Sequence, residues 1–98
     1  MKRVGKIKAN KLIEQGAFAV DMRSPVLFRY TQVKNTVNLP LTNLVNKLVG
    51  VKKDTKVLLI HDSADNPDIQ KACNYALQLG ISDVSFIDYD TLISESAK

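Results

Sequence analysis

The stretch that decides the fold is KVLLIHDSADNPDIQ, residues 56–70. Its first five residues, 56–60, end in a continuous aliphatic run, and a run without polar alternation is typical of a central parallel strand covered on both faces. Polar residues and Pro67 follow, so the strand is expected to lead through a loop into a helix. Ligand sites of parallel sheets lie beyond the carboxyl ends of their strands, which makes this loop the first candidate site.

Strand-like and helix-like segments alternate on both sides of this stretch. Parallel strands need crossover connections, so this order predicts an α/β fold with three layers, α/β/α, around a small and mainly parallel central sheet. Beyond the strand at 56–60, we expect strands at 17–22, 36–39 and 83–87, helices at 10–15, 41–49 and 67–79, a short turn or helix around 26–28, a solvated N-terminal segment and a short C-terminal tail.

The clearest helix is the one that begins at Pro67 and ends at Gly80. Asp65 or Asn66 is expected to cap it, and Asp68 suits the positive end of its dipole. Thr42 is expected to cap the preceding helix. The spacing of the apolar residues predicts a buried stripe on which Cys73 behaves as a small hydrophobic residue. That stripe comprises Ile69, Ala72, Cys73, Ala76 and Leu77.

Length and composition indicate one domain spanning residues 1–98. The chain has 98 residues, of which 45% are hydrophobic and 24% charged, an ordinary composition for a small globular domain. No apolar run approaches the roughly 20 residues that cross a bilayer, and the start of the chain has no secretory pattern. A single cysteine forms no internal disulfide. We therefore expect a soluble cytoplasmic protein that does not contact a membrane.

Charge is distributed unevenly along the chain. Residues 1–56 hold twelve Lys and Arg against three acids, a balance of +9, whereas residues 57–98 hold two against seven, a balance of −5. The N-terminal stretch MKRVGKIKANK lacks the interleaved aromatic residues and the motif of a nucleic-acid-binding surface. Nucleic acid is therefore an unlikely partner.

Four stretches, in order, resemble a known family. AVDMRS matches a hydrophobic strand that ends in Asp-x-Arg, here Asp21 and Arg23. VKNTVNLP matches the pattern Ile-Pro-Gly-Ala-x-Asn-Ile-Pro, with Asn35 and Thr36 in place of the glycine and the alanine. KVLLIH matches the central strand, and ALQLGISDVSFID matches the end of the last helix and the final strand. With these, nearly the whole chain resembles a single-domain rhodanese homology module. The resemblance implies a mainly structural role for Asp21 and Arg23.

The resemblance also implies that the active site is degenerate. In that family a cysteine directly after the central strand carries sulfur as a persulfide, and here His61 stands at that position. An imidazole cannot carry a persulfide through the reaction. Asp62, Asp65 and Asp68 would oppose a sulfur anion. We therefore predict a module that binds or regulates without catalysing sulfur transfer, with no cofactor and an unknown protein partner. Its candidate ligand-binding loop comprises His61, Asp62, Ser63, Ala64, Asp65 and Asn66.

Three other interpretations stay open. A diverged sulfurtransferase or sulfur carrier would use Cys73 or a partner's cysteine. His61 and the neighbouring carboxylates could bind a metal ion, although their spacing fits no defined motif and no metal is expected. His61 could also act as a general acid or base, with Ser63 as its one nearby nucleophile. The partner and the oligomeric state do not follow from the sequence.

Overall fold

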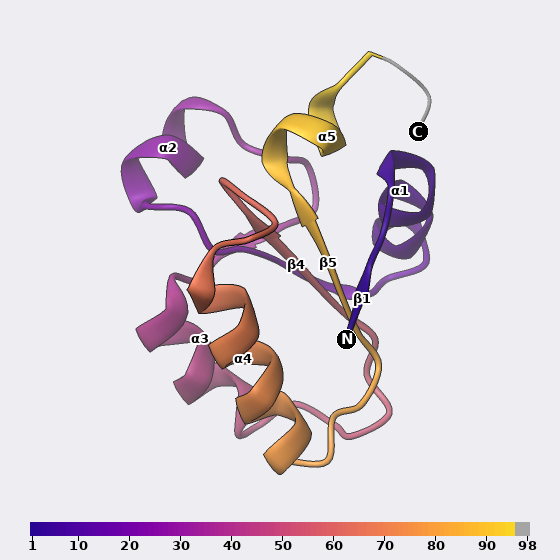
Figure 1. Cartoon of the computed structure of the whole chain (residues 1–98), viewed down its shortest axis with the longest axis vertical. Coiled ribbons are helices and arrows are strands. Elements are labelled where there is room, and N and C mark those ends of the chain that lie inside the picture. Colours follow the sequence, from indigo (N-terminus) through magenta and orange to yellow (C-terminus); the bar gives the residue numbers. More distant parts are fainter. Residues whose placement is uncertain (96–98) are drawn as a thin grey trace.

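The computed structural model describes residues 1–95, in which strands and helices alternate along the chain (Figure 1). The predicted alternation is confirmed. The elements are β1 (Lys2–Arg3), α1 (Lys6–Glu14), β2 (Phe18–Asp21), α2 (Pro25–Tyr30), β3 (Val37–Asn38), α3 (Leu41–Leu48), β4 (Val57–His61), α4 (Pro67–Gln78), β5 (Val84–Asp88) and α5 (Tyr89–Ile93).

The five strands form one sheet in the order β1-β5-β4-β2-β3, and every neighbouring pair is parallel. β4 lies at the centre, as its aliphatic run predicts, and all five of its residues are buried. Within residues 1–95, no helix is long and apolar enough to span a bilayer.

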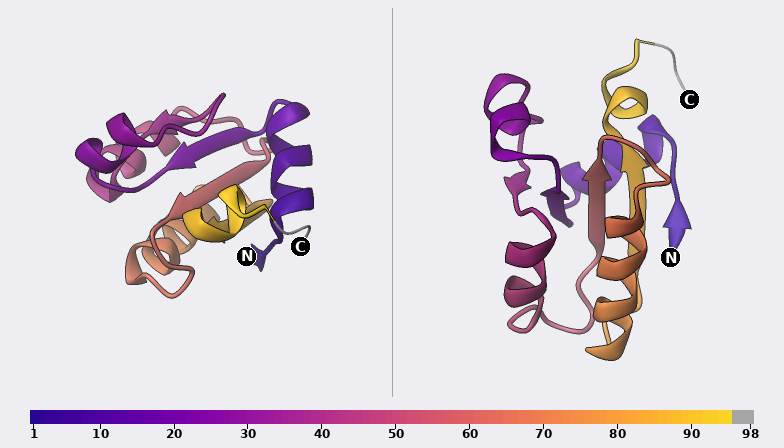
Figure 2. Two further views of the ribbon diagram at one scale, coloured as in Figure 1. Left: turned by 90° about the horizontal axis from the view of Figure 1, so that it is seen from above. Right: turned by 60° about the vertical axis from the view of Figure 1, so that its left-hand side comes forward.

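Two hydrophobic cores lie on the two faces of this sheet. Val57 and Leu59 of β4 belong to the core under α3 and α4, whereas Leu58 and Ile60 belong to the core under α1 and α5. Figure 2 shows the helices around the sheet from two further directions. Alternate side chains of a strand point to opposite faces, so one continuous apolar strand supplies both cores. The predicted three-layer α/β/α architecture is confirmed.

Both ends of the described segment hold more secondary structure than the sequence predicts, and residues 96–98 of the expected tail lie outside the described residues. The N-terminal segment forms the edge strand β1, and the Val4 N–H donates to the Phe86 carbonyl at 3.0 Å. Both side chains of β1 are exposed, so no apolar pattern marks the strand. α1 then begins at Lys6 rather than at residue 10.

The expected C-terminal tail includes the helix α5. Asp88 caps this helix, because the Thr91 N–H donates to the Asp88 Oδ2 at 3.0 Å and the Thr91 hydroxyl donates to the Asp88 Oδ1 at 2.8 Å. Burial opposes the ionised form of Asp88, yet the bonds from Thr91 and the charge of Arg3 lower its pKa. A helix of five residues has too little periodicity to be recognised in the sequence.

Two details of the expected helices are wrong. Leu77 is 52% exposed, although the rest of the predicted α4 stripe is buried. Thr42 does not cap α3, since Pro40 occupies the cap position and no side chain bonds there. Of the two candidates for the cap of α4, Asn66 fills the position.

Asn35 holds an unusual backbone conformation in the loop before β3. Its φ is +64°, the one positive value among the non-glycine residues that the structure describes. Asparagine tolerates this left-handed region better than other residues with a side chain, because its short polar group can bond locally. The need for positive φ explains why asparagine stands where the resemblance expects glycine.

We predict that Asn35→Val lowers the free energy of unfolding by about 1–2 kcal/mol, whereas Asn35→Gly leaves it nearly unchanged. Urea denaturation measures both, with Lys34→Val as the control for a valine in the same exposed loop. If Asn35→Val is as stable as Lys34→Val, the left-handed backbone at this position does not restrict the side chain.

Candidate functional site

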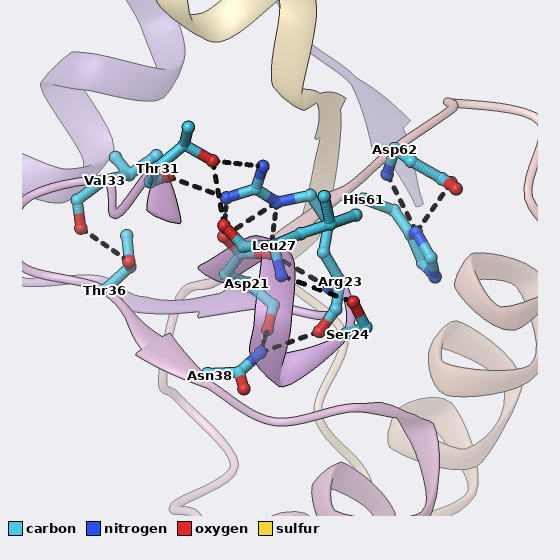
Figure 3. Close-up of polar contacts among 10 residues, drawn as sticks. All are labelled: Asp21, Arg23, Ser24, Leu27, Thr31, Val33, Thr36, Asn38, His61 and Asp62. Atoms are coloured by element: carbon cyan, nitrogen blue, oxygen red, sulfur yellow. Dashed lines mark hydrogen bonds and ion pairs between the residues drawn. The ribbon is translucent and has the colours of Figure 1, made fainter. Parts of the chain in front are cut away.

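The candidate site lies along the carboxyl edge of the sheet, where β2, β4 and β5 end. Register brings these ends together, since Asp21 pairs with Ile60 and His61 pairs with Asp88. Two groups of polar side chains occupy this edge, one around Arg23 and one around His61 (Figure 3).

Asp21 and Arg23 form a fully enclosed ion pair. Asp21 is 0% exposed and Arg23 is 4% exposed. The Arg23 Nη2 donates to the Asp21 Oδ2 at 2.7 Å and the Arg23 Nε donates to the Asp21 Oδ1 at 3.0 Å, so the guanidinium binds both carboxylate oxygens. The Arg23 backbone N–H also donates to the Asp21 Oδ1 at 3.0 Å. The Asp-x-Arg spacing thus makes a compact turn at the end of β2.

The Arg23 guanidinium also joins this turn to two helices. It donates to the Thr31 hydroxyl at 3.0 Å and to the Thr31 carbonyl at 2.8 Å, at the end of α2. Its Cζ lies 3.7 Å from the centre of the Tyr89 ring, in the first turn of α5, a cation–π contact. Burial opposes the charged form, but the contacts with Asp21 outweigh burial and raise the pKa of Arg23.

β3 is tied to the same turn by Asn38. Its side-chain amide donates to the Asp21 carbonyl at 2.9 Å and to the Arg23 carbonyl at 2.8 Å. The sequence does not predict that Thr31, Asn38 and Tyr89 lie around the Asp21–Arg23 turn. For Asn38 there is one signal in the sequence, because it belongs to the VKNTVNLP stretch that carries the family resemblance.

We predict that Arg23→Met lowers the free energy of unfolding by roughly 3–5 kcal/mol, because it leaves the Asp21 carboxylate buried without a counter-charge. Urea denaturation provides the measurement, and Arg29→Met on exposed α2 is the control. The double variant Asp21→Leu with Arg23→Met should lose less free energy of unfolding than the sum of the losses in the two single variants. Equal stability of Arg23→Met and Arg29→Met would contradict a stabilising role for the pair.

His61 is the last residue of β4 and is only 7% exposed. Its Nδ1 lies 2.8 Å from the Asp62 Oδ1 and also 2.8 Å from the Asp62 backbone N–H, which donates to it. The backbone bond needs a lone pair on Nδ1, whereas the carboxylate contact needs a proton there. The two contacts therefore cannot both be hydrogen bonds at the same time, because Nδ1 either carries a proton or accepts one.

The other ring nitrogen, the His61 Nε2, is buried and has no hydrogen-bond partner within residues 1–95. Its nearest acid is Asp68, whose Oδ2 lies 3.7 Å away. His61 is thus held between two carboxylates, one on each side of the ring. No group of three His, Cys, Asp or Glu side chains in the described chain could hold a metal ion, and the arrangement does not favour the metal interpretation.

Hydrogen bonds among residues 61–66 occupy the backbone N–H groups of Asp62, Asp65 and Asn66. The Asp65 N–H donates to the Ser63 hydroxyl at 3.2 Å, and the Asn66 N–H donates to the Ser63 carbonyl at 3.2 Å. The Asp68 N–H donates to the Asn66 Oδ1 at 2.9 Å, which is the cap of α4. These N–H groups are therefore directed at neighbouring acceptors of the protein and not at a ligand.

Asp62 adds negative charge beside His61. Its carboxylate accepts from the Asn66 side-chain amide at 3.1 Å. Partial burial raises its pKa, but the Asn66 bond and the His61 ring outweigh burial, and the net pKa of Asp62 is lowered. The Asp62 side chain is 59% exposed. An ionised carboxylate therefore faces solvent at the entrance to the loop.

The structure separates the candidate loop residues into two sets. His61, Asp62 and Asn66 contact one another. Ala64, Asp65 and Asn66 line a surface cavity of about 310 Å³, whose other lining residues are Met1, Pro67, Ile69, Gln70 and Phe86.

Cys73 lies away from the loop, in the core between α4 and the sheet, and is 1% exposed. Desolvation by burial raises the pKa of its thiol to about 11. The thiolate, rather than the thiol, is the nucleophile in sulfur chemistry. Cys73 is therefore uncharged and enclosed at neutral pH.

Comparison with known proteins finds no matching protein-family model and no curated protein that matches the sequence. Solved structures do match. A rhodanese-related protein from Thermoplasma volcanium has a TM-score of 0.76 and 19% identity, over 100% of this chain and 96% of its own. The chain has the rhodanese-like fold.

Two further structures agree with this assignment. A human single-domain sulfurtransferase has a TM-score of 0.77 and 14% identity, over 99% of each chain. A single-domain sulfurtransferase from Saccharomyces cerevisiae has a TM-score of 0.70 and 14% identity, over 97% of this chain and 90% of its own. At these identities the likeness establishes the rhodanese-like fold alone.

Proposed function

We propose that residues 1–98 form one rhodanese-like domain without sulfurtransferase activity, which binds or regulates a protein partner. Binding uses the loop of residues 61–68 and the basic N-terminal face formed by β1 and α1. The observation that carries this proposal is that the N–H groups of Asp62, Asp65 and Asn66 already bond to acceptors within residues 61–66. The free thiol of Cys73 agrees with a reducing compartment, and we place the domain in the cytoplasm.

Sulfur transfer needs a thiolate and donors that stabilise its negative charge. A low thiol pKa arises beside cations or at a helix N-terminus whose N–H groups are free. At the start of α4 the Asp68 N–H bonds to the Asn66 side chain, and His61 supplies no sulfur. The position that would present a nucleophile therefore lacks the nucleophile, and the Asp68 N–H at the start of α4 is already bonded.

Charge opposes an anionic substrate at the same place. The exposed carboxylate of Asp62 and the 38% exposed side chain of Asp68 lie on the two sides of the His61 ring. These charges would repel thiosulfate and favour a basic segment of a partner instead. The adjacent α2 presents apolar side chains, with Val26 61% exposed and Tyr30 84% exposed. Acidic and apolar groups together suit protein recognition at this edge.

We predict no thiosulfate:cyanide sulfurtransferase turnover by the full chain above that of Cys73→Ala. His61→Cys is the sharper variant, because it restores the missing sulfur but leaves the N–H donors of Asp65, Asn66 and Asp68 occupied. We expect it to remain at background, with thermal unfolding used to check that it is folded. His61→Ala is its matched control.

Turnover by the unmodified chain would overturn the proposal. Turnover by His61→Cys alone would show that the loop can still hold a sulfur anion, which removes the observation on which the proposal rests.

The alternative is a sulfur carrier that uses Cys73. It requires an accessible thiolate, and burial raises the pKa of this thiol to about 11. We predict that iodoacetamide labels Cys73 slowly in the folded protein at pH 7 and rapidly in urea. Because the thiolate reacts, the rate in the folded protein should rise roughly tenfold for each pH unit up to the thiol pKa.

An exposed thiol on the same helix provides the control for this labelling. Asn74 is exposed, so Asn74→Cys in a Cys73→Ala background should react at the rate of an ordinary cysteine. Equal labelling of Cys73 and this control, or a +32 Da sulfur adduct on Cys73 after exposure to a persulfide donor, would favour the sulfur-carrier alternative.

A further inference from the structure

A second cavity, of about 400 Å³, lies at the opposite end of the sheet from the 61–68 loop. It is bounded by the edge strand β1, the starts of β4 and β5, and α1. Figure 1 shows β1 beside β5 at the edge of the sheet, on the right of the view together with α1. Its lining residues are Met1, Lys2, Lys8, Leu12, Lys56, Ser82, Asp83, Val84 and Ser85.

Three lysines from three separate segments give this cavity a positive charge. Lys2 belongs to β1, Lys8 to α1, and Lys56 directly precedes β4. In residues 1–95, none of the three has a carboxylate within the 4.0 Å that defines an ion pair, although Asp83 lines the same cavity. Their ammonium groups are therefore available to an anion.

Ser85 places a buried polar group in the cavity wall. It is only 6% exposed, and its hydroxyl makes no hydrogen bond that involves the described residues. Alternation along β5 turns it toward α1, the face on which Ile87 is buried. Among the described residues, the one buried side-chain polar atom without a partner is the His61 Nε2. The Ser85 hydroxyl is therefore not enclosed, and it is accessible to a ligand in the cavity that Ser85 lines.

We propose that this cavity binds a small ligand through a phosphate group. Lys2, Lys8 and Lys56 supply the positive charge. The Ser85 hydroxyl donates a hydrogen bond to a phosphate oxygen, and the exposed hydroxyl of Ser82 at the rim supplies another. This inference goes beyond the proposed binding of a protein partner, because it assigns a small ligand to a cavity in the basic N-terminal face.

The cavity favours a small ligand over a nucleic acid. None of its lining residues is aromatic, and unpaired bases bind proteins mainly by stacking on aromatic side chains. Asp83 adds a carboxylate that would accept a hydrogen bond from a hydroxyl of the ligand but would repel a second phosphate. A monophosphate, either inorganic phosphate or a phosphate ester with hydroxyl groups, fits these groups best.

The test is a titration of the ¹⁵N-labelled full chain, followed by NMR, with inorganic phosphate and separately with glucose 6-phosphate. Sodium chloride at equal ionic strength is the reference, because it reproduces charge screening. We expect saturable shifts at the amides of residues 82–85 and Lys2, with affinity of about 1 mM or tighter.

Variants locate the binding. Lys8→Gln and Lys56→Gln should each weaken binding roughly fivefold to tenfold, and Ser85→Ala roughly threefold to fivefold. Lys11→Gln is the matched control, since Lys11 is exposed on the same helix but does not line the cavity. It should leave the affinity unchanged.

Each outcome decides the inference. Equal affinity for the two ligands supports it and assigns free phosphate, and tighter binding of glucose 6-phosphate supports it and assigns an ester. Shifts that do not saturate, that match sodium chloride, or that weaken as much with Lys11→Gln as with Lys8→Gln would overturn it. The sulfurtransferase assay does not involve this cavity, so failure of either proposal is recognised separately.

Discussion

The buried ion pair between Asp21 and Arg23 holds the carboxyl edge of the sheet together. A guanidinium that is 4% exposed is stable there because a carboxylate, a hydroxyl, a carbonyl and an aromatic ring surround it. Through these contacts the end of β2 is joined to α2 and α5, and Asn38 adds β3. The loop after β4 therefore lies beside the Asp21–Arg23 turn, which these contacts hold in place.

Beside this fixed turn, His61 is held in a different way. One ring nitrogen meets two groups of Asp62, and the other is buried without a hydrogen bond within residues 1–95. Internal bonds of the loop, from the N–H groups of Asp65, Asn66 and Asp68, keep its shape without a ligand. These internal bonds support the proposal that the loop takes part in recognition and not in sulfur chemistry.

Two of the cavities differ in charge in the same way as the two halves of the chain. Ala64, Asp65 and Asn66 line the first cavity, beside the acids that follow β4. Lys2, Lys8 and Lys56 of the N-terminal half line the second, and Met1 lies in the walls of both. The charge asymmetry of the sequence therefore becomes a difference in charge between two neighbouring parts of the surface.

Three features follow from the sequence alone: the three layers, the central position of β4, and the pairing of Asp21 with Arg23. Each depends on residues that are close together in the chain, namely alternating segments, an unbroken aliphatic run, and two charges at a spacing of two. It also narrowed the cap of α4 to two residues. Only the tertiary structure decided that Asn66 is that cap, that Lys2–Arg3 form an edge strand, and that Thr31, Asn38 and Tyr89 meet Arg23. Most of these features depend on contacts between residues that are far apart in the chain. A local pattern of side chains does not indicate which distant backbone segment or aromatic ring will lie nearby in the folded protein.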